Sequence, residues 1–353
     1  MKRRLGIIYA MVCTLLLCGG FLVAFFFAWS AGVESVIECI CGLALGFILS
    51  PIVHELGHIF IANVYGMRLV YTKFFCIKIS VKEGKNHLGF ISPFAPDCTQ
   101  VIPKSGGNMD KRACGYTLGG LVFSGLFFIA IFVEAVACSL FGFTRFLLWG
   151  MLPYTAYLFF LNALPFAYAS GKTDMLVYIG LKKGYDAEKN MLSAMEIQGR
   201  LYAGESYAQI DEALYFNVPQ LCEDEPLYAV MLDLRYRYYL EKGEMEKAAD
   251  CLNRLANSQE YLSDEEVEKL AAELVYIHSV LGNVELANEN GKACSAYLLS
   301  DCAQAKRILL AYSLANGKTD AVETLKEQAK TALEREWIEG EAKFERILLS
   351  RLV

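Results

Sequence analysis

The stretch from Ser50 to Phe60 reads SPIVHELGHIF and lies inside a long apolar run, Val36–Met67. After Glu38, the ionisable side chains of this run are His54, Glu55 and His58, in a chain that has only four histidines. Charged and titratable residues are costly in hydrocarbon and mark functional sites when they occur there. The run therefore predicts a membrane-spanning helix that carries a site.

The chain divides into two halves of different composition. It has 353 residues, and 55% of them are apolar. Residues 1–184 carry 15 Lys/Arg and 8 Asp/Glu, whereas residues 185–353 carry 18 and 31. We interpret 1–184 as a transmembrane domain and 185–353 as a cytoplasmic, helical domain, whose negative charge argues against a nucleic-acid partner.

Four apolar runs are long enough to span a bilayer, which takes about 20 residues. They are Leu5–Val33, Val36–Met67, Ala113–Leu140 and Phe146–Ala169. The first run could instead be a signal peptide, but its length and the lack of a small-residue cleavage site favour a retained helix. The predicted fold class is mostly α, a polytopic helical membrane protein followed by an α-helical repeat domain.

Basic residues set the expected orientation. Lys2, Arg3 and Arg4 precede the first run, and the segment 68–112 between the second and third runs is also basic. Cytoplasmic loops are enriched in Lys and Arg. Both termini are therefore expected in the cytoplasm of a multi-pass protein of a bacterial-type cytoplasmic membrane, in contact with its lipid.

The loop between the second and third runs has β character. Residues 69–81 are rich in β-branched and aromatic types, residues 83–86 have turn chemistry, and residues 87–92 could form a returning strand. We expect a β-hairpin associated with the membrane surface and supported by the helices, because an isolated hairpin is only marginally stable.

The motif H-E-x-x-H at positions 54–58 has a direct chemical interpretation. Residues i and i+4 share one helix face, so His54 and His58 can bind one Zn²⁺. Glu55 then lies near the open coordination position and can act as the general acid and base. Zinc needs a third protein ligand, and Asp174 follows the fourth run at a suitable depth. We interpret His87 and His278 as ordinary side chains.

Together with the sequence NALP from Asn162 to Pro165, followed by Asp174, the HELGH motif resembles the site-2 protease family of intramembrane zinc metalloproteases. The resemblance covers residues 36–182. It implies that His54, His58 and Asp174 bind zinc, that Glu55 is catalytic, and that Asn162 contacts the substrate or the oxyanion. It also implies a membrane-associated β element whose edge receives the substrate.

Three features differ from the family pattern, namely the connection to Asp174, Met175 and the segment Gly119–Ser124, and the cysteines form no recognisable site. Residues 166–173 make a longer connection to Asp174 than the family motif has, and Met175 replaces the expected glycine. The segment Gly119–Ser124 keeps glycines but lacks Pro and Asn, and we interpret it as a helix-packing element. The 12 cysteines contain no C-x-x-C pair and indicate small apolar residues rather than disulfides.

The acidic half has a repeated pattern. Gly243, Gly282 and Gly317 lie 39 and 35 residues apart, each between two predicted helices. This spacing is similar to the tetratricopeptide repeat, whose period is about 34 residues. Such arrays commonly bind peptides or proteins, so we expect this half to bind a protein or peptide ligand.

The sequence therefore predicts an intramembrane zinc endopeptidase. Its substrate would be a small membrane protein, a regulator, or a signal or precursor peptide. The alternative is a catalytically silent membrane receptor or scaffold that acts through its helical repeats, and a metal-dependent enzyme other than a protease is a third interpretation.

Overall fold

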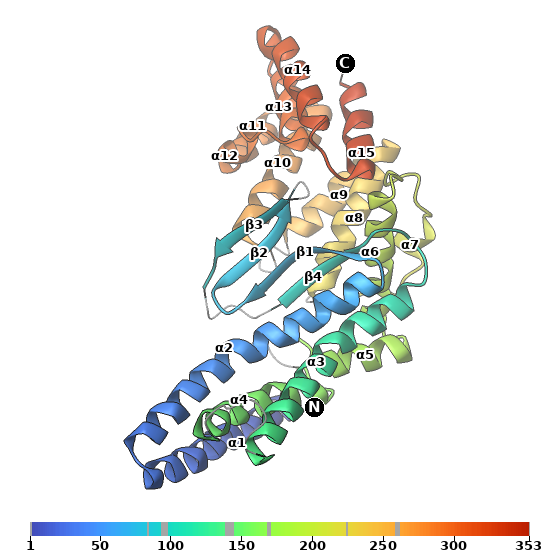
Figure 1. Ribbon diagram of the computed structural model, residues 1–353. Coiled ribbons are helices and arrows are strands. Elements are labelled where there is room, and N and C mark those ends of the chain that lie inside the picture. Colours follow the sequence, from blue (N-terminus) through green and yellow to red (C-terminus); the bar gives the residue numbers. More distant parts are fainter. Residues whose placement is uncertain are drawn as a thin grey trace. The chain divides into compact units, whose positions relative to one another are not determined.

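Two compact units make up the chain in the computed structural model (Figure 1). The structure describes residues 2–82, 85–92, 98–137, 145–167, 171–223, 225–257 and 262–352. The first unit comprises Met1–Ile102 and Asn108–Tyr185, and the second comprises Pro103–Gly107 and Asp186–Val353. Helices predominate in both units, as the sequence predicts.

Four helices of the first unit are long and apolar enough to cross a membrane. They are α1 (Lys2–Ala31), α2 (Val33–Val64), α3 (Met109–Ala137) and α4 (Arg145–Ala163). The four predicted runs are thus confirmed as long apolar helices. Helix α4 ends at Ala163 rather than at the predicted Ala169, because a residue that precedes proline, here Leu164, disfavours the helical conformation. The predicted end of the third run, Leu140, and residues 168–169 lie outside the described residues.

Small residues allow α2 to pack closely against its neighbours. A Cβ atom added to Gly42 would lie 2.0 Å from the carbonyl oxygen of Leu147 in α4. One added to Gly57 would lie 2.4 Å from the carbonyl oxygen of Gly119 in α3. Figure 1 shows α2 and α3 side by side in this region. The predicted packing role of Gly119 is therefore confirmed, and its contact fixes the HELGH turn against α3.

A four-stranded sheet replaces the predicted hairpin. Its strands are β1 (Met67–Phe74), β2 (Ile77–Lys82), β3 (Lys85–Phe90) and β4 (Cys98–Pro103), in the order β3-β2-β1-β4. The pairs β1–β2 and β2–β3 are antiparallel, with Thr72 opposite Ile79 and Ile79 opposite Leu88.

The prediction of a single strand over 69–81 was wrong, because this segment forms parts of β1 and β2. Phe75 adopts a φ of 54°, and this left-handed residue reverses the chain between β1 and β2. The returning strand predicted at 87–92 is present as β3, two residues earlier. Of the turn predicted over 83–86, residues 83–84 lie outside the described residues, whereas Lys85 and Asn86 belong to β3. Strand β4 was not predicted.

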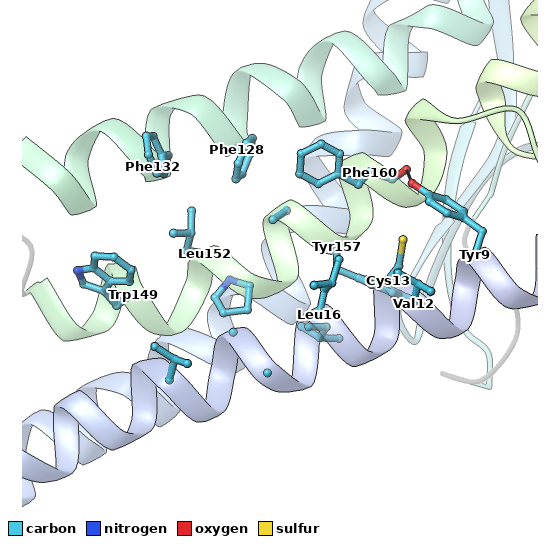
Figure 2. Close-up of a pocket in the computed structure, with 16 residues that line it drawn as sticks. Tyr9, Val12, Cys13, Leu16, Phe128, Phe132, Trp149, Leu152, Tyr157 and Phe160 are labelled. Carbon is cyan, nitrogen blue, oxygen red and sulfur yellow. Dashed lines mark hydrogen bonds between the residues drawn. The ribbon is translucent and has the colours of Figure 1, made fainter.

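The first unit also contains an apolar pocket of about 650 Å³ between α1, α3 and α4 (Figure 2). Leu16, Phe128, Trp149 and other apolar side chains line it, and its lining includes no charged residue. At one end, the hydroxyl of Tyr9 donates a 2.6 Å hydrogen bond to the carbonyl of Phe160. The lining contains no histidine or carboxylate, and Cys13 is its one thiol, so the pocket holds neither a group of metal ligands nor an acid–base pair.

The second unit is an array of short helices around its own core. They are α6 (Asp186–Tyr202), α7 (Ala213–Phe216), α8 (Pro226–Lys242), α9 (Met245–Ala256), α10 (Asp264–Val280), α11 (Val284–Ala293), α12 (Ser295–Leu298), α13 (Ala303–Ala315), η2 (Thr319–Ala321), α14 (Val322–Leu333) and α15 (Glu339–Ser350). Three of the helix ends are followed by Gly243, Gly282 and Gly317, with φ values of 80°, 77° and 70°. The positive φ of each glycine ends one helix and lets the next pack against it, which forms the hairpins α8–α9, α10–α11 and α13–α14.

A buried ion cluster lies inside this array. The guanidinium of Arg307 is fully buried and donates to Glu345 at 2.7 Å and to Glu273 at 2.6 Å. Glu273 also accepts a 2.6 Å hydrogen bond from the hydroxyl of Tyr236. The cluster links α8, α10, α13 and α15. Buried charges require such partners, and this network of ion pairs and hydrogen bonds supplies them within the second unit.

Candidate metal centre

The three predicted metal ligands meet in the first unit. Nε2 of His54 lies 3.2 Å from Oδ2 of Asp174, and Nε2 of His58 lies 3.4 Å from the same oxygen. The two Nε2 atoms are 3.3 Å apart. Both histidines are buried, and the side chain of Asp174 is 20% exposed. Three potential ligand atoms therefore form a nearly equilateral triangle inside the unit.

The triangle has the dimensions that a tetrahedral metal site requires. Ligand bonds of about 2.0–2.1 Å at tetrahedral angles place the ligand atoms about 3.3 Å from one another. The three measured separations agree with this value. Among the described residues, His54, His58 and Asp174 are the one group of His, Cys, Asp and Glu side chains with this capacity to hold a metal ion.

Hydrogen bonds fix the tautomers of both imidazoles. Nδ1 of His58 lies 2.8 Å from the backbone carbonyl of Tyr116, which can only accept, so Nδ1 carries the proton. Nδ1 of His54 lies 2.8 Å from the hydroxyl of Ser124, which itself donates to the carbonyl of Gly120. The hydroxyl oxygen therefore accepts from His54. Each Nε2 atom is left with a lone pair directed toward the centre.

The carboxylate completes a group that needs a shared cation. Oδ2 of Asp174 is buried, and among the described residues no donor other than the two imidazoles approaches it. With both Nε2 atoms unprotonated, three acceptors converge with nothing to offset their repulsion. A proton on one Nε2 would bridge to Asp174 but would leave the other Nε2 facing it unpaired. One metal ion satisfies all three atoms, so the residues present fit a metal.

Gly120 provides the space for the two imidazoles. A Cβ atom at this position would lie 2.4 Å from Nε2 of His58 and 2.8 Å from Nε2 of His54. A side chain on Gly120 would therefore occupy the volume in which the ligand atoms meet. Helix α3 serves the centre three times, through the open space at Gly120, the hydroxyl of Ser124 and the backbone carbonyl of Tyr116.

Thr173 delivers Asp174 to the histidines. Its hydroxyl donates to the carbonyl of Leu164 at 2.7 Å and accepts from the backbone N–H of Leu176 at 3.3 Å, which caps helix α5 (Asp174–Lys183). Its backbone N–H donates to the carbonyl of Phe166 at 3.0 Å. The described ends of the connection after Pro165, residues 166–167 and 171–173, thus lie against each other, and the first residue of α5 reaches the centre despite the departure from the family spacing.

Glu55 is buried on the helix that carries both histidines. Its Oε2 atom accepts a 2.5 Å hydrogen bond from the hydroxyl of Thr99 in β4. Asn162 lies near the end of α4, and its amide donates to the carbonyl of Leu158 at 3.3 Å. This bond is internal to α4, and the role of Asn162 toward a substrate stays a prediction. His87 lies in the exposed strand β3, and His278 lies in α10 of the second unit.

Four contributors to the site were missed by the sequence reasoning, namely Thr99, Tyr116, Ser124 and Thr173. Ser124 had a signal in the sequence: it lies four residues after Gly120, on one face of α3, in a segment that we interpreted as packing alone. Thr173 also had a local signal, because a threonine directly before a helix is a typical N-cap. Thr99 and Tyr116 are recognisable only from contacts between distant segments.

No protein-family model, curated protein or solved structure matches this chain. The geometry of the centre and the motif that supplies it are therefore the features that bear on function.

Proposed function

We propose that this chain is an intramembrane zinc-dependent endopeptidase of the site-2 protease type. The observation that carries the proposal is the convergence of His54, His58 and Asp174 beside Glu55, on a helix apolar enough to cross a membrane. Ionisable side chains are costly in hydrocarbon, so their presence in such a helix indicates that they serve a function.

Zinc is the metal that suits these ligands. Two imidazole nitrogens and one carboxylate oxygen with tetrahedral spacing are a typical donor set for catalytic zinc, which keeps its fourth position open. When bound there, zinc supplies Lewis acidity toward a peptide carbonyl and makes water a competent nucleophile near neutral pH.

Glu55 performs the proton transfers. In hydrolysis, the water oxygen bonds to the carbonyl carbon, the C–N bond breaks, and one proton must move from the water to the leaving nitrogen. Glu55 accepts that proton on its carboxylate and passes it to the amine. Thr99 holds Oε2, which assigns the transfer to Oε1.

The substrate is a segment that can leave the helical state. A helical amide is hydrogen-bonded and shielded, so a scissile bond in or near a membrane span requires helix-weakening residues such as Gly, Pro or Asn. Strand β4, which carries Thr99, is at one end of the sheet order. Such a strand suits recognition of an extended peptide by strand addition. A small membrane protein, a regulator or a precursor peptide has the required form.

The second unit supplies a binding surface. It contains a cleft of about 450 Å³ lined by apolar and charged side chains, including Leu255, Asp233, Arg237 and Lys269. A mixed lining of this kind suits a peptide or protein ligand. We assign this unit to the recruitment of a substrate or regulator.

The test separates metal binding from catalysis. Glu55→Gln should keep about one zinc ion per chain and lose cleavage, because the amide cannot take up the proton. Metal content is measured by plasma mass spectrometry, and cleavage by comparative membrane proteomics, with small single-span proteins expected to accumulate in the variant. Glu34→Gln, an exposed position near the start of the same helix, is the matched control.

Two outcomes would contradict the proposal. A wild-type protein without metal would support the silent receptor. Identical proteomes for wild type and Glu55→Gln, with zinc present in both, would exclude Glu55 as the proton carrier.

A further inference from the structure

We infer that two threonines of the sheet, Thr72 in β1 and Thr99 in β4, form a hydrogen-bond chain that positions the carboxylate of Glu55. The inference rests on the proposed function and names positioning residues for that same site. The resemblance to a protease family assigns no role to either threonine.

The direction of the chain follows from counting protons. The hydroxyl of Thr99 donates to Oε2 of Glu55 at 2.5 Å, and a carboxylate has no proton to return. The hydroxyl of Thr72 lies 2.8 Å from that of Thr99. Because the single hydroxyl proton of Thr99 is used on Glu55, the hydroxyl of Thr72 must be the donor of the second bond. The two bonds run from Thr72 to Thr99 to Glu55.

The chain is held in a fixed place. Thr72 is 1% exposed and Glu55 is 4% exposed, and β1 and β4 are neighbours in the sheet. The hydroxyl of Tyr116 donates to the backbone carbonyl of Thr99. The backbone carbonyl of Tyr116 accepts from Nδ1 of His58. One residue of α3 therefore fixes both the strand that aims Glu55 and the imidazole of a metal ligand.

This arrangement has a functional consequence. A general base must be held near its productive geometry, and the surrounding residues supply that restraint. A carboxylate with one oxygen tied to the sheet cannot rotate freely about its side-chain bonds. The sheet thus acts on the chemistry of the site as well as on peptide recognition, and the hydrogen bond made by Thr99 is the link.

The experiment measures binding of acetohydroxamate, a small chelator that shares a proton with a neighbouring carboxylate when it binds a metal. Full-length protein in detergent is loaded with Co²⁺, whose visible absorption reports both metal content and binding of the probe. Thr99→Val keeps the shape of the side chain and removes the donor. We expect unchanged Co²⁺ content and a hydroxamate Kd about 10-fold weaker, the usual size for loss of a hydrogen bond to a charged group.

Three further variants separate positioning from packing. Thr99→Ser keeps the hydroxyl and should bind hydroxamate as the wild type does. Thr72→Val leaves β4 unchanged and should weaken binding by a smaller factor, which tests the chain even if Thr99→Val disturbs folding. Thr155→Val is the control, because Thr155 is buried to the same extent as Thr72, and its hydroxyl donates to the carbonyl of Leu152 within α4.

A double-mutant cycle identifies the route of the effect. In a Glu55→Ala background, Thr99→Val should cause no further loss, because the carboxylate that Thr99 positions is absent. An equal loss in both backgrounds would show that Thr99 acts on packing alone and would overturn the inference.

The outcomes also distinguish this inference from the proposed function. Normal hydroxamate affinity in both Thr99→Val and Thr72→Val, with weakened affinity in Glu55→Ala, would overturn the inference alone. A wild-type protein that takes up no Co²⁺ would overturn the proposed function and this inference together.

Discussion

His54 and His58 can act as metal ligands because their other ring nitrogens are already engaged. Tyr116 accepts from one Nδ1–H and Ser124 accepts from the other, so both Nε2 lone pairs are directed inward before any metal binds. Partners of this kind fix the tautomer and the ring orientation of a ligand, and their loss typically costs about 10–100-fold in metal affinity. The orientation is therefore a property of individual hydrogen bonds, and it can be tested residue by residue.

Asp174→Ala should abolish stable metal binding. It removes the oxygen that closes the triangle and should weaken affinity by more than about 100-fold, beyond the range for indirect partners. Metal content after dialysis is the measurement. Asp110→Ala is the matched control, because Asp110 is an exposed aspartate in the first turn of α3, just as Asp174 lies in the first turn of α5. Equal metal content in both variants would remove Asp174 from the ligand set.

At the scale of elements, helix α3 organises the centre. Its Gly119 contacts the backbone of α2 at Gly57, its Gly120 leaves space for the imidazoles, and its Ser124 orients His54. Close approach of helix backbones needs residues without bulky side chains. The same short segment therefore sets the distance between two helices and the shape of the site between them.

Gly120→Ala tests whether the space beside the imidazoles matters more than the stability of helix α3 itself. Alanine is the better helix former, but its Cβ would lie 2.4 Å from Nε2 of His58. The helices must move apart or the imidazoles must turn, so we expect loss of bound metal and a destabilisation of about 1–3 kcal/mol. Metal content and thermal unfolding in detergent are the readouts.

Gly19→Ala is the control, since a Cβ atom at Gly19 in α1 would have no neighbour within 4 Å. Full metal content in Gly120→Ala would show that the imidazoles do not need this space.

At the scale of the whole molecule, the two units differ in apolar character and in charge. The first contains the four apolar helices. Most of the acidic residues lie after residue 184, where the chain has 31 Asp/Glu and 18 Lys/Arg. The first unit can bury the metal ligands in an apolar setting, whereas the second has its own core and its own ion cluster. The units therefore suit two tasks, chemistry and recruitment.

The orientation in the membrane can be tested with fusions. The positively charged start, Lys2–Arg4, and the basic segment 68–112 predict cytoplasmic termini. Alkaline phosphatase fused after Gly32, between α1 and α2, should be active, and the same enzyme fused at the C-terminus should be inactive. The opposite pattern of activity would show that the topology is inverted, with both termini outside the cytoplasm.

Local patterns accounted for much of this protein. Apolar runs of sufficient length indicated the four helices, the glycines at 243, 282 and 317 marked helix ends, and the i, i+4 spacing of His54 and His58 placed both on one face. Asp174 was expected as the third ligand from its position after the fourth run and from a family resemblance. In the first three cases the information lies within a few turns of one element, because helix periodicity and chain stiffness operate over short distances.

Contacts between segments far apart in the chain decided the rest. The presence of β4 and the roles of Thr99, Tyr116 and Ser124 depend on which segments pack together. A hydroxyl group has the same chemistry wherever it occurs in the chain. Its partner is set by folding, which brought Thr99 to Glu55 across 44 positions and Ser124 to His54 across 70. The candidate metal ligands could therefore be predicted from the sequence, whereas the residues that orient them could be identified only from the tertiary structure.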